Sequence, residues 1–180
     1  MQKTFSNKSK EERLDLIEAI AESYQYQYGG CGQSVLIALQ RGLDLPGGPI
    51  VIKAASYACS GMVRMGDMCG ALFGAIMAIG LASGRDNMKE KPFPEPDVID
   101  EKTGNPKSLE HARRFYRKFI EDFGGCNCKA IHTKMIGRTY DLGVPEEFKD
   151  FCQAGQEKCA ELVGRTARLA AEAILEMPRR

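Results

Sequence analysis

The stretch CGALFGAIMAIGLA, residues 69–82, is the longest apolar run of the chain and decides the class of fold. It is shorter than the roughly 20 apolar residues of a membrane-crossing helix, and Arg64, Asp67 and Arg85 lie close to its ends. The run therefore predicts a buried helix and no membrane insertion. Its glycines and alanines leave a surface of small side chains, which lets neighbouring helices approach closely.

Three further helical segments are predicted before this run. Ser9 and Glu12 have the spacing of a capping box and start a first helix, which ends at Tyr28 before two glycines. A second helix is expected from Cys31 to about residue 42. The apolar segment 50–58 fits a helix or a strand, and its alanines favour a helix.

After the run, helical patterns are predicted over 109–123, from Cys128 to about residue 135, and over 145–174 with a candidate break at Gly155. Four prolines among charged residues make 87–106 a long, Pro-rich surface loop, and loops of this length are often functional. The sequence shows no strand-rich region and no internal repeat. The fold prediction is all-α, a compact single-domain helical bundle over residues 1–180.

Composition narrows the class of partner. A chain of 180 residues with 43% hydrophobic content is long enough for one complete core. The formal charge of +1, without a basic block, predicts no nucleic-acid partner. The N-terminal residues lack the apolar core of a signal peptide, so a cytoplasmic location is expected.

Seven cysteines then call for an explanation, because cytoplasmic thiols stay reduced and serve metal binding or catalysis more often than disulfides. Cys31, Cys69 and Cys128 each follow glycine-containing segments and precede a predicted helix. Partial positive charge at a helix N-terminus favours the thiolate. We therefore expect several helix N-termini to converge on one pocket, with Cys69 as the candidate catalytic thiol.

The other thiols carry weaker signals. Cys59 and Cys152 lie within apolar patterns typical of core packing, and Cys126 is an accessory candidate beside Cys128; the three are retained as accessory candidates. Cys152 and Cys159 would share one face of a continuous helix. His132 could share the face of Cys128, although a lone histidine is more often simply packed or solvated. The chain contains no CxxC knuckles, ferredoxin-type cysteine run or haem attachment motif.

The residues resemble a known family, the redox-active proteins named for a C…GCAxxG…C…C cysteine pattern, with a CGAxxG motif as hallmark. Residues 69–74, CGALFG, match that motif directly. Further matches are CGQSV at 31–35, FGG at 123–125 with Cys128, and KCAELV at 158–163, so the resemblance covers roughly residues 14–176. It implies that Cys31, Cys69, Cys128 and Cys159 are the four characteristic cysteines.

The resemblance also implies a small helical redox protein, and a similar domain occurs in a dihaem cytochrome that carries an iron–sulfur cluster. The first hypothesis is that Cys31, Cys69, Cys128 and Cys159 bind an iron–sulfur cluster of unspecified type, for electron transfer or small-substrate redox chemistry. The second is a metal-free thiol–disulfide oxidoreductase with Cys69 as the attacking thiol. The third is a structural zinc module on the same ligands. Expected partners are a redox partner protein or a small-molecule substrate, and a homodimer is left open.

Overall fold

The computed structural model describes residues 5, 7–84 and 105–177, and these residues form seven α-helices without a β-strand. The predicted all-α fold is confirmed. The helices are α1 (Lys10–Tyr28), α2 (Cys31–Leu43), α3 (Gly48–Ala54), α4 (Gly70–Ser83), α5 (Asn105–Phe123), α6 (Cys128–Ile136) and α7 (Pro145–Leu175). No helix in this part of the chain is long and apolar enough to cross a membrane.

The first two helices begin and end where local sequence signals place them. The Ser9 hydroxyl accepts a hydrogen bond from the Glu12 amide at 3.2 Å, and the Glu12 carboxylate accepts one from the Ser9 amide at 2.7 Å. This is the predicted capping box. Gly29 and Gly30 have φ of 69° and 79°, in the left-handed region that favours glycine. The chain therefore reverses between α1 and α2.

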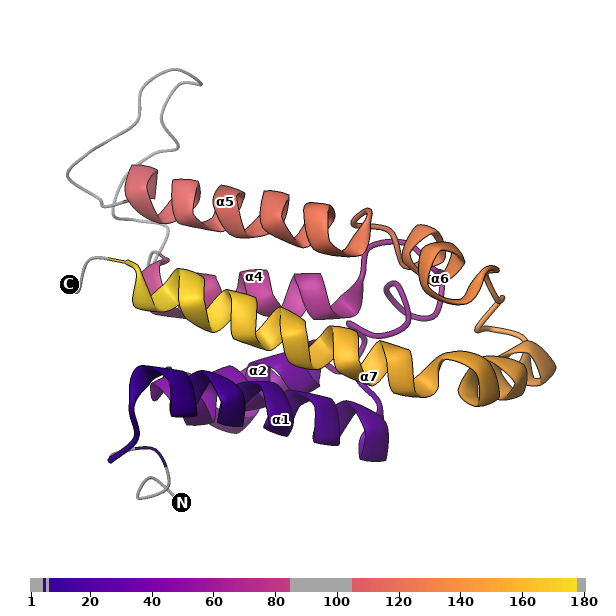
Figure 1. Cartoon of the computed structure of the whole chain (residues 1–180), viewed down its shortest axis with the longest axis horizontal. Coiled ribbons are helices and arrows are strands. Elements are labelled where there is room, and N and C mark those ends of the chain that lie inside the picture. The colour runs from indigo at the N-terminus through magenta and orange to yellow at the C-terminus, as the bar shows by residue number, and fades with distance from the viewer. Residues whose placement is uncertain (1–4, 6, 85–104, 178–180) are drawn as a thin grey trace.

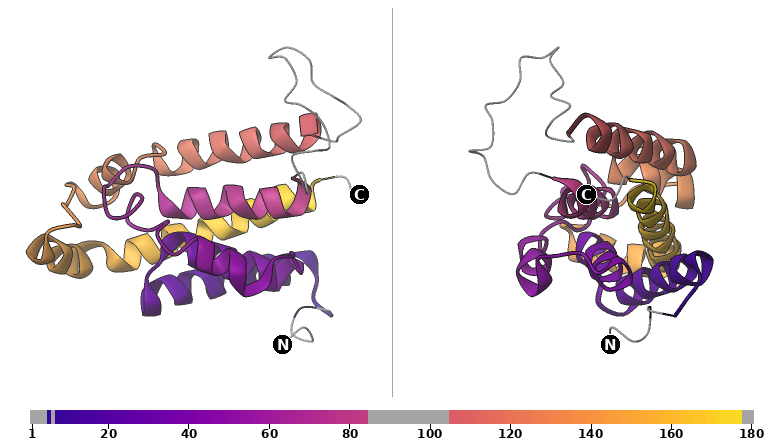
Figure 2. Two further views of the ribbon diagram at one scale, coloured as in Figure 1. Left: turned by 180° about the vertical axis from the view of Figure 1, so that it is seen from behind. Right: turned by 90° about the vertical axis from the view of Figure 1, so that its left-hand side faces the viewer.

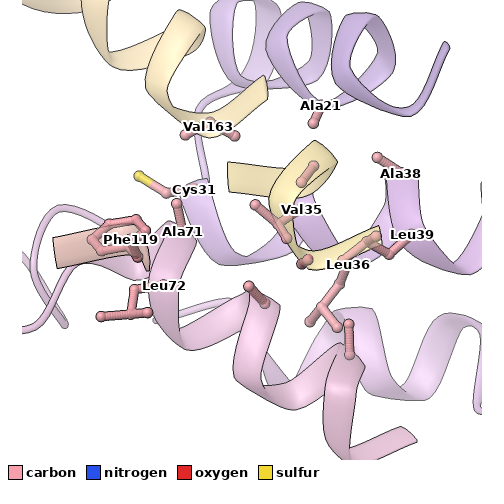
Figure 3. Packing of buried hydrophobic residues seen from close by; sticks show 14 of the residues in the cluster. Ala21, Cys31, Val35, Leu36, Ala38, Leu39, Ala71, Leu72, Phe119 and Val163 are labelled. Atoms are coloured by element: carbon pink, nitrogen blue, oxygen red, sulfur yellow. The ribbon is translucent and has the colours of Figure 1, made fainter. Parts of the chain in front are cut away.

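Helix α7 packs against more of the bundle than any other helix, with contacts to α1, α2, α4, α5 and α6. Figures 1 and 2 show α1, α2, α4, α5 and α7 lying lengthwise beside one another, with α6 at one end. The starts of α2 and α4 lie at that same end (Figure 1). The core between the helices is filled mainly by leucine, alanine, isoleucine, valine and phenylalanine side chains (Figure 3).

Three glycines bring α2 and α4 unusually close together. A Cβ atom on Gly32 would lie 2.8 Å from the Ala58 Cβ and 3.1 Å from the Gly70 carbonyl oxygen. A Cβ atom on Gly74 would lie 2.7 Å from the Gly32 Cα and would press on the Gly32 carbonyl oxygen. Only glycine fits these positions without a backbone shift. The small-residue surface predicted for residues 69–82 is thus used for backbone contact.

Three sequence predictions differ from the structure. Helix α3 covers Gly48–Ala54 instead of 50–58. The predicted loop 87–106 lies largely outside the described residues, but its last two residues begin α5, where the absent amide proton of Pro106 costs nothing in a first turn. Helix α7 runs through Gly155 without a break. A Cβ atom there would lie 2.9 Å from the Phe151 ring, so the glycine makes room for packing.

Candidate functional site

Four cysteines that are far apart in the sequence face one cavity. Cys31 is the first residue of α2, Cys69 caps the start of α4, Cys128 is the first residue of α6, and Cys159 lies within α7. All four line a cavity of about 30 Å³, more than the 10–15 Å³ or so that one water molecule needs. All seven cysteines are free thiols. The structure therefore brings together the four cysteines singled out by the family resemblance.

Backbone hydrogen bonds fix the relative positions of Cys69 and Cys128. The Cys69 amide donates to the Cys126 carbonyl oxygen at 2.8 Å, and the Cys128 amide donates to the Asp67 carbonyl oxygen at 2.6 Å. Met68 and Asn127 form an isolated antiparallel bridge between the same two segments. The Asn127 side chain accepts a hydrogen bond from the Ala130 amide and caps α6. This two-segment junction holds the starts of α4 and α6 side by side.

Cys31 is held next to Cys69 by the close approach of α2 and α4. A Cβ atom on Gly70 would press on the Ala58 carbonyl oxygen and lie 3.2 Å from the Cys31 Cβ, so glycine is required beside Cys31. The Gly32 amide donates to the Ala58 carbonyl oxygen at 3.0 Å. Figure 3 shows Cys31 between Val163 and Ala71, with its sulfur at the edge of the apolar core. The glycines of the CGAxxG motif therefore position the thiols.

The loop that carries Cys59 passes beside the site in a strained conformation. Ser60, Met62, Val63 and Arg64 have positive φ between 43° and 68°, which is unusual for residues with side chains and most costly for the β-branched valine. Backbone hydrogen bonds close the loop, including one of 3.2 Å from the Gly66 amide to the Ser60 carbonyl oxygen. Such strain is often concentrated at functional sites. Here the loop directs the Ser60 amide toward the sulfur of Cys31.

The thiols that line the cavity differ in their tendency to ionise. A hydrogen bond from the Cys159 thiol lowers the pKa of Cys31 to about 7, against the opposing effect of burial, and raises the pKa of Cys159. The backbone amides of Ser60 and Cys31 and the Gln25 side chain also hydrogen-bond to the Cys31 sulfur. Cys31 is thus the more acidic thiol of the pair, and Cys159 keeps its proton near neutral pH.

Cys69 behaves differently from the expectation for a thiol at a helix N-terminus. The amides of Leu72 and Ala71 do lower its pKa, but burial outweighs them and raises the pKa of Cys69 to about 12. Burial also raises the pKa of Cys128. The assignment of Cys69 as the attacking thiol stays a prediction, but the protonation pattern favours Cys31 as the thiolate of the metal-free protein.

The accessory candidates lie outside the cavity lining. Cys59, Cys126 and Cys152 are partly exposed, and burial raises the pKa of Cys59. Cys126 hydrogen-bonds to the Tyr116 hydroxyl and raises the pKa of that phenol. Cys152 packs against a small second apolar cluster formed by Tyr140, Leu142 and Phe151. None of the three faces the four-thiol cavity directly.

Two residues of the cavity received little or no weight from the sequence. His132 is buried beside Cys128, where the four-residue spacing was the only available signal. Gln25, on α1, hydrogen-bonds to Cys31, and its Oε1 atom is buried without a partner among the described residues. No local pattern marks Gln25, because only the packing of α1 against the bundle brings it to the site.

The four cysteines that line the cavity are of the residue type that binds iron–sulfur clusters. Four thiols facing one cavity equal the usual number of protein ligands of an iron–sulfur cluster. Within residues 5, 7–84 and 105–177, no three cysteine, histidine, aspartate or glutamate side chains are arranged to hold a single metal ion. The thiols therefore surround the cavity without converging on one point.

Comparisons with known proteins agree with the arrangement of cysteines. Neither the curated proteins nor the solved structures include a significant match to the chain. A sequence model of one protein family, described as "Putative redox-active protein (C_GCAxxG_C_C)", matches residues 28–173. That range covers most of the chain and contains all four cysteines that line the cavity. The chain belongs to the redox-active C_GCAxxG_C_C family.

Proposed function

We propose that the protein is an electron-transfer or small-substrate redox protein in which Cys31, Cys69, Cys128 and Cys159 bind an iron–sulfur cluster. The observation that carries the proposal is the convergence of these four thiols, from four different helices, on one buried cavity. Cluster ligation does not require the sulfurs to meet at a single point, because the thiolates bind different iron ions. Such a cluster, when bound, would supply one-electron redox chemistry.

The residues of this chain would supply the environment of the cluster. The backbone amides of Ala71 and Leu72 favour negative charge on the Cys69 sulfur, and those of Cys31 and Ser60 do the same at the Cys31 sulfur. Apolar side chains, including Leu162 and Val163, form much of the remaining lining of the cavity. A redox partner protein or small-molecule substrate is part of this proposal, as is the cytoplasmic location.

The test is the iron and acid-labile sulfide content, with a visible absorption spectrum, of protein purified without oxygen. Wild type is compared with Cys69→Ser, which removes a cavity thiol, and with Cys152→Ser, which removes a thiol outside the cavity. We expect stoichiometric iron and sulfide in wild type and Cys152→Ser, and loss of both in Cys69→Ser. Wild-type protein without iron and sulfide would refute the cluster, and stoichiometric zinc would point to a structural metal site instead.

A metal-free dithiol is the second candidate, favoured by the hydrogen bond between Cys31 and Cys159 and the lowered pKa of Cys31. The Cys31 thiolate would attack a disulfide of a substrate, forming a mixed disulfide and releasing one substrate thiolate. Cys159, after losing its proton to solvent, would then attack the Cys31 sulfur and release the second substrate thiolate. The substrate gains two electrons and the chain keeps a Cys31–Cys159 disulfide.

Peptide mapping tests this candidate after metal-free protein is treated with glutathione disulfide. A Cys31–Cys159 disulfide and two equivalents of reduced glutathione are expected, with the same result in Cys152→Ala. Stable glutathione adducts on Cys59 or Cys126, with Cys31 and Cys159 still reduced, would rule out the dithiol reaction.

A further inference from the structure

His132 is a buried polar residue in direct contact with one of the four thiols. The residue is only 3% exposed, and its Nε2 atom lies 3.6 Å from the Sγ atom of Cys128. The two residues are four positions apart on α6, so the helix itself places them on one face. Both side chains line the cavity. The histidine is therefore fixed beside this sulfur by local structure.

A second apolar cluster holds the imidazole ring from the other side. The Phe151 ring stacks on His132 with a centroid distance of 4.6 Å and an interplanar angle of 20°. The Tyr140 ring packs edge-on against Phe151 at 5.9 Å. Both aromatic residues are buried, and they come from α7 and the segment before it. The orientation of the His132 ring is therefore also fixed by aromatic packing in which Cys128 takes no part.

The chemistry of the two groups sets the direction of their hydrogen bond. A histidine ring carries at least one N–H donor in either protonation state. An ionised cysteine sulfur, as in a bound thiolate, can only accept. The 3.6 Å contact with an ionised Cys128 is a hydrogen bond in the tautomer that carries the proton on Nε2, because the thiolate has no proton to donate. Such bonds to ligand sulfurs stabilise the additional negative charge of a reduced cluster.

We propose that His132 is a positioning residue of the redox site: its Nε2–H group donates a hydrogen bond to the ionised sulfur of Cys128, holds that sulfur toward the cavity, and favours the reduced state of the centre. This inference rests on the proposed cluster and assigns a residue outside the four cysteines to the control of its potential.

Two substitutions separate the hydrogen bond from the packing of the ring. His132→Phe keeps an aromatic ring that can stack on Phe151 but has no donor. His132→Gln gives up the stacking but can place an amide N–H group near the position of Nε2. Iron and sulfide content and the one-electron midpoint potential are measured on anaerobically purified wild type and both variants. Thermal unfolding of the metal-free proteins reports whether each variant folds.

The expected result is a bound cluster in all three proteins and a lower midpoint potential in His132→Phe. Loss of one hydrogen bond to a charged group should weaken reduction about tenfold, which corresponds to about 59 mV for a one-electron couple. His132→Gln should recover most of this difference. Iron retained by His132→Gln but lost from His132→Phe would also support the inference. The glutamine variant keeps an N–H donor and loses the stacking, whereas the phenylalanine variant keeps the stacking and loses the donor.

Other outcomes would overturn it. An unchanged potential in His132→Phe, or a change in His132→Gln alone, would assign the ring a packing role, as would loss of iron from both folded variants. Wild-type protein without a cluster would refute the proposed function itself and the inference with it. Because wild type is measured beside the variants, the two kinds of failure are distinguishable.

Discussion

Substitution of Gly74 by alanine tests whether close backbone contact between α2 and α4 builds the thiol site. The added methyl group would lie 2.7 Å from the Gly32 Cα and against its carbonyl oxygen, and these backbone atoms cannot rotate away. Overpacking of this kind costs about 1–3 kcal/mol. Alanine is better than glycine in a helix by about 1 kcal/mol, which offsets part of that cost. We expect Gly74→Ala to lower the free energy of unfolding by up to about 2 kcal/mol.

Gly80 provides a matched control on the same helix. It is exposed, and a Cβ atom added there would meet no atom of the described residues within 4 Å. Gly80→Ala should therefore show the helix-propensity gain alone and stabilise the protein by up to about 1 kcal/mol. The two variants make the same chemical change with opposite expected signs. Their difference measures the contact at Gly74.

The assay is urea unfolding of the reduced, metal-free protein, followed by circular dichroism, with midpoints compared at equal slope. The iron content of anaerobically purified protein is measured in parallel. A shifted α4 would move Cys69 away from Cys31, so Gly74→Ala should also bind less iron than Gly80→Ala. Equal midpoints for the two variants would show that the bundle absorbs a methyl group at Gly74 and would refute this account of the motif.

Three further predictions concern the thiols and one surface ion cluster. In the native metal-free protein, iodoacetamide should modify the partly exposed Cys59 before Cys69, which is 6% exposed. A time course followed by mass spectrometry gives the order of modification, and the reverse order would contradict the burial of Cys69. The rate of Cys31 alkylation should rise with pH, with a midpoint at about 7. Cys159→Ala should move this midpoint to higher pH, because the hydrogen bond donated by the Cys159 thiol is lost. An unchanged midpoint in Cys159→Ala would contradict the pairing of the two thiols. Arg168, on α7, forms ion pairs with three carboxylates of α1. Arg168→Ala should therefore lower the free energy of unfolding by about 1 kcal/mol at low salt and by less at 1 M NaCl. Equal losses in urea denaturation at the two salt concentrations would argue against an ionic origin.

Helix starts and ends were predictable from sequence where local chemistry fixes them. The Ser9–Glu12 capping box and the cysteine at the start of α4 are examples, because each depends only on residues within one helical turn. The continuity of α7 through Gly155 was not predictable. The glycine costs about 1 kcal/mol in isolation, and the packing of Phe151 and Ile136 into the space that it leaves is a tertiary contact.

The grouping of the four cavity thiols was likewise predictable only in part. Placement of Cys31, Cys69 and Cys128 at helix starts follows from the sequence, and so does the membership of Cys159 in the characteristic set by family resemblance. Their common cavity depends on how α2, α4, α6 and α7 cross. The same is true of Gln25, which reaches Cys31 only because α1 packs beside α2.

The protonation of the site shows why helix N-termini alone do not make thiolates here. At Cys69 the amides of α4 do favour ionisation, but the glycine contacts that bring the helices together also exclude water, and burial dominates. At Cys31 the pKa is lowered in spite of burial, because the Cys159 thiol donates a hydrogen bond to its sulfur in place of water. Ionisation of all four thiols would need a positive partner, and the described residues that line the cavity include no lysine or arginine. A metal centre would supply that charge, since metal binding displaces thiol protons. The packing that suppresses free thiolates at this site is therefore compatible with the metal-bound state that we propose.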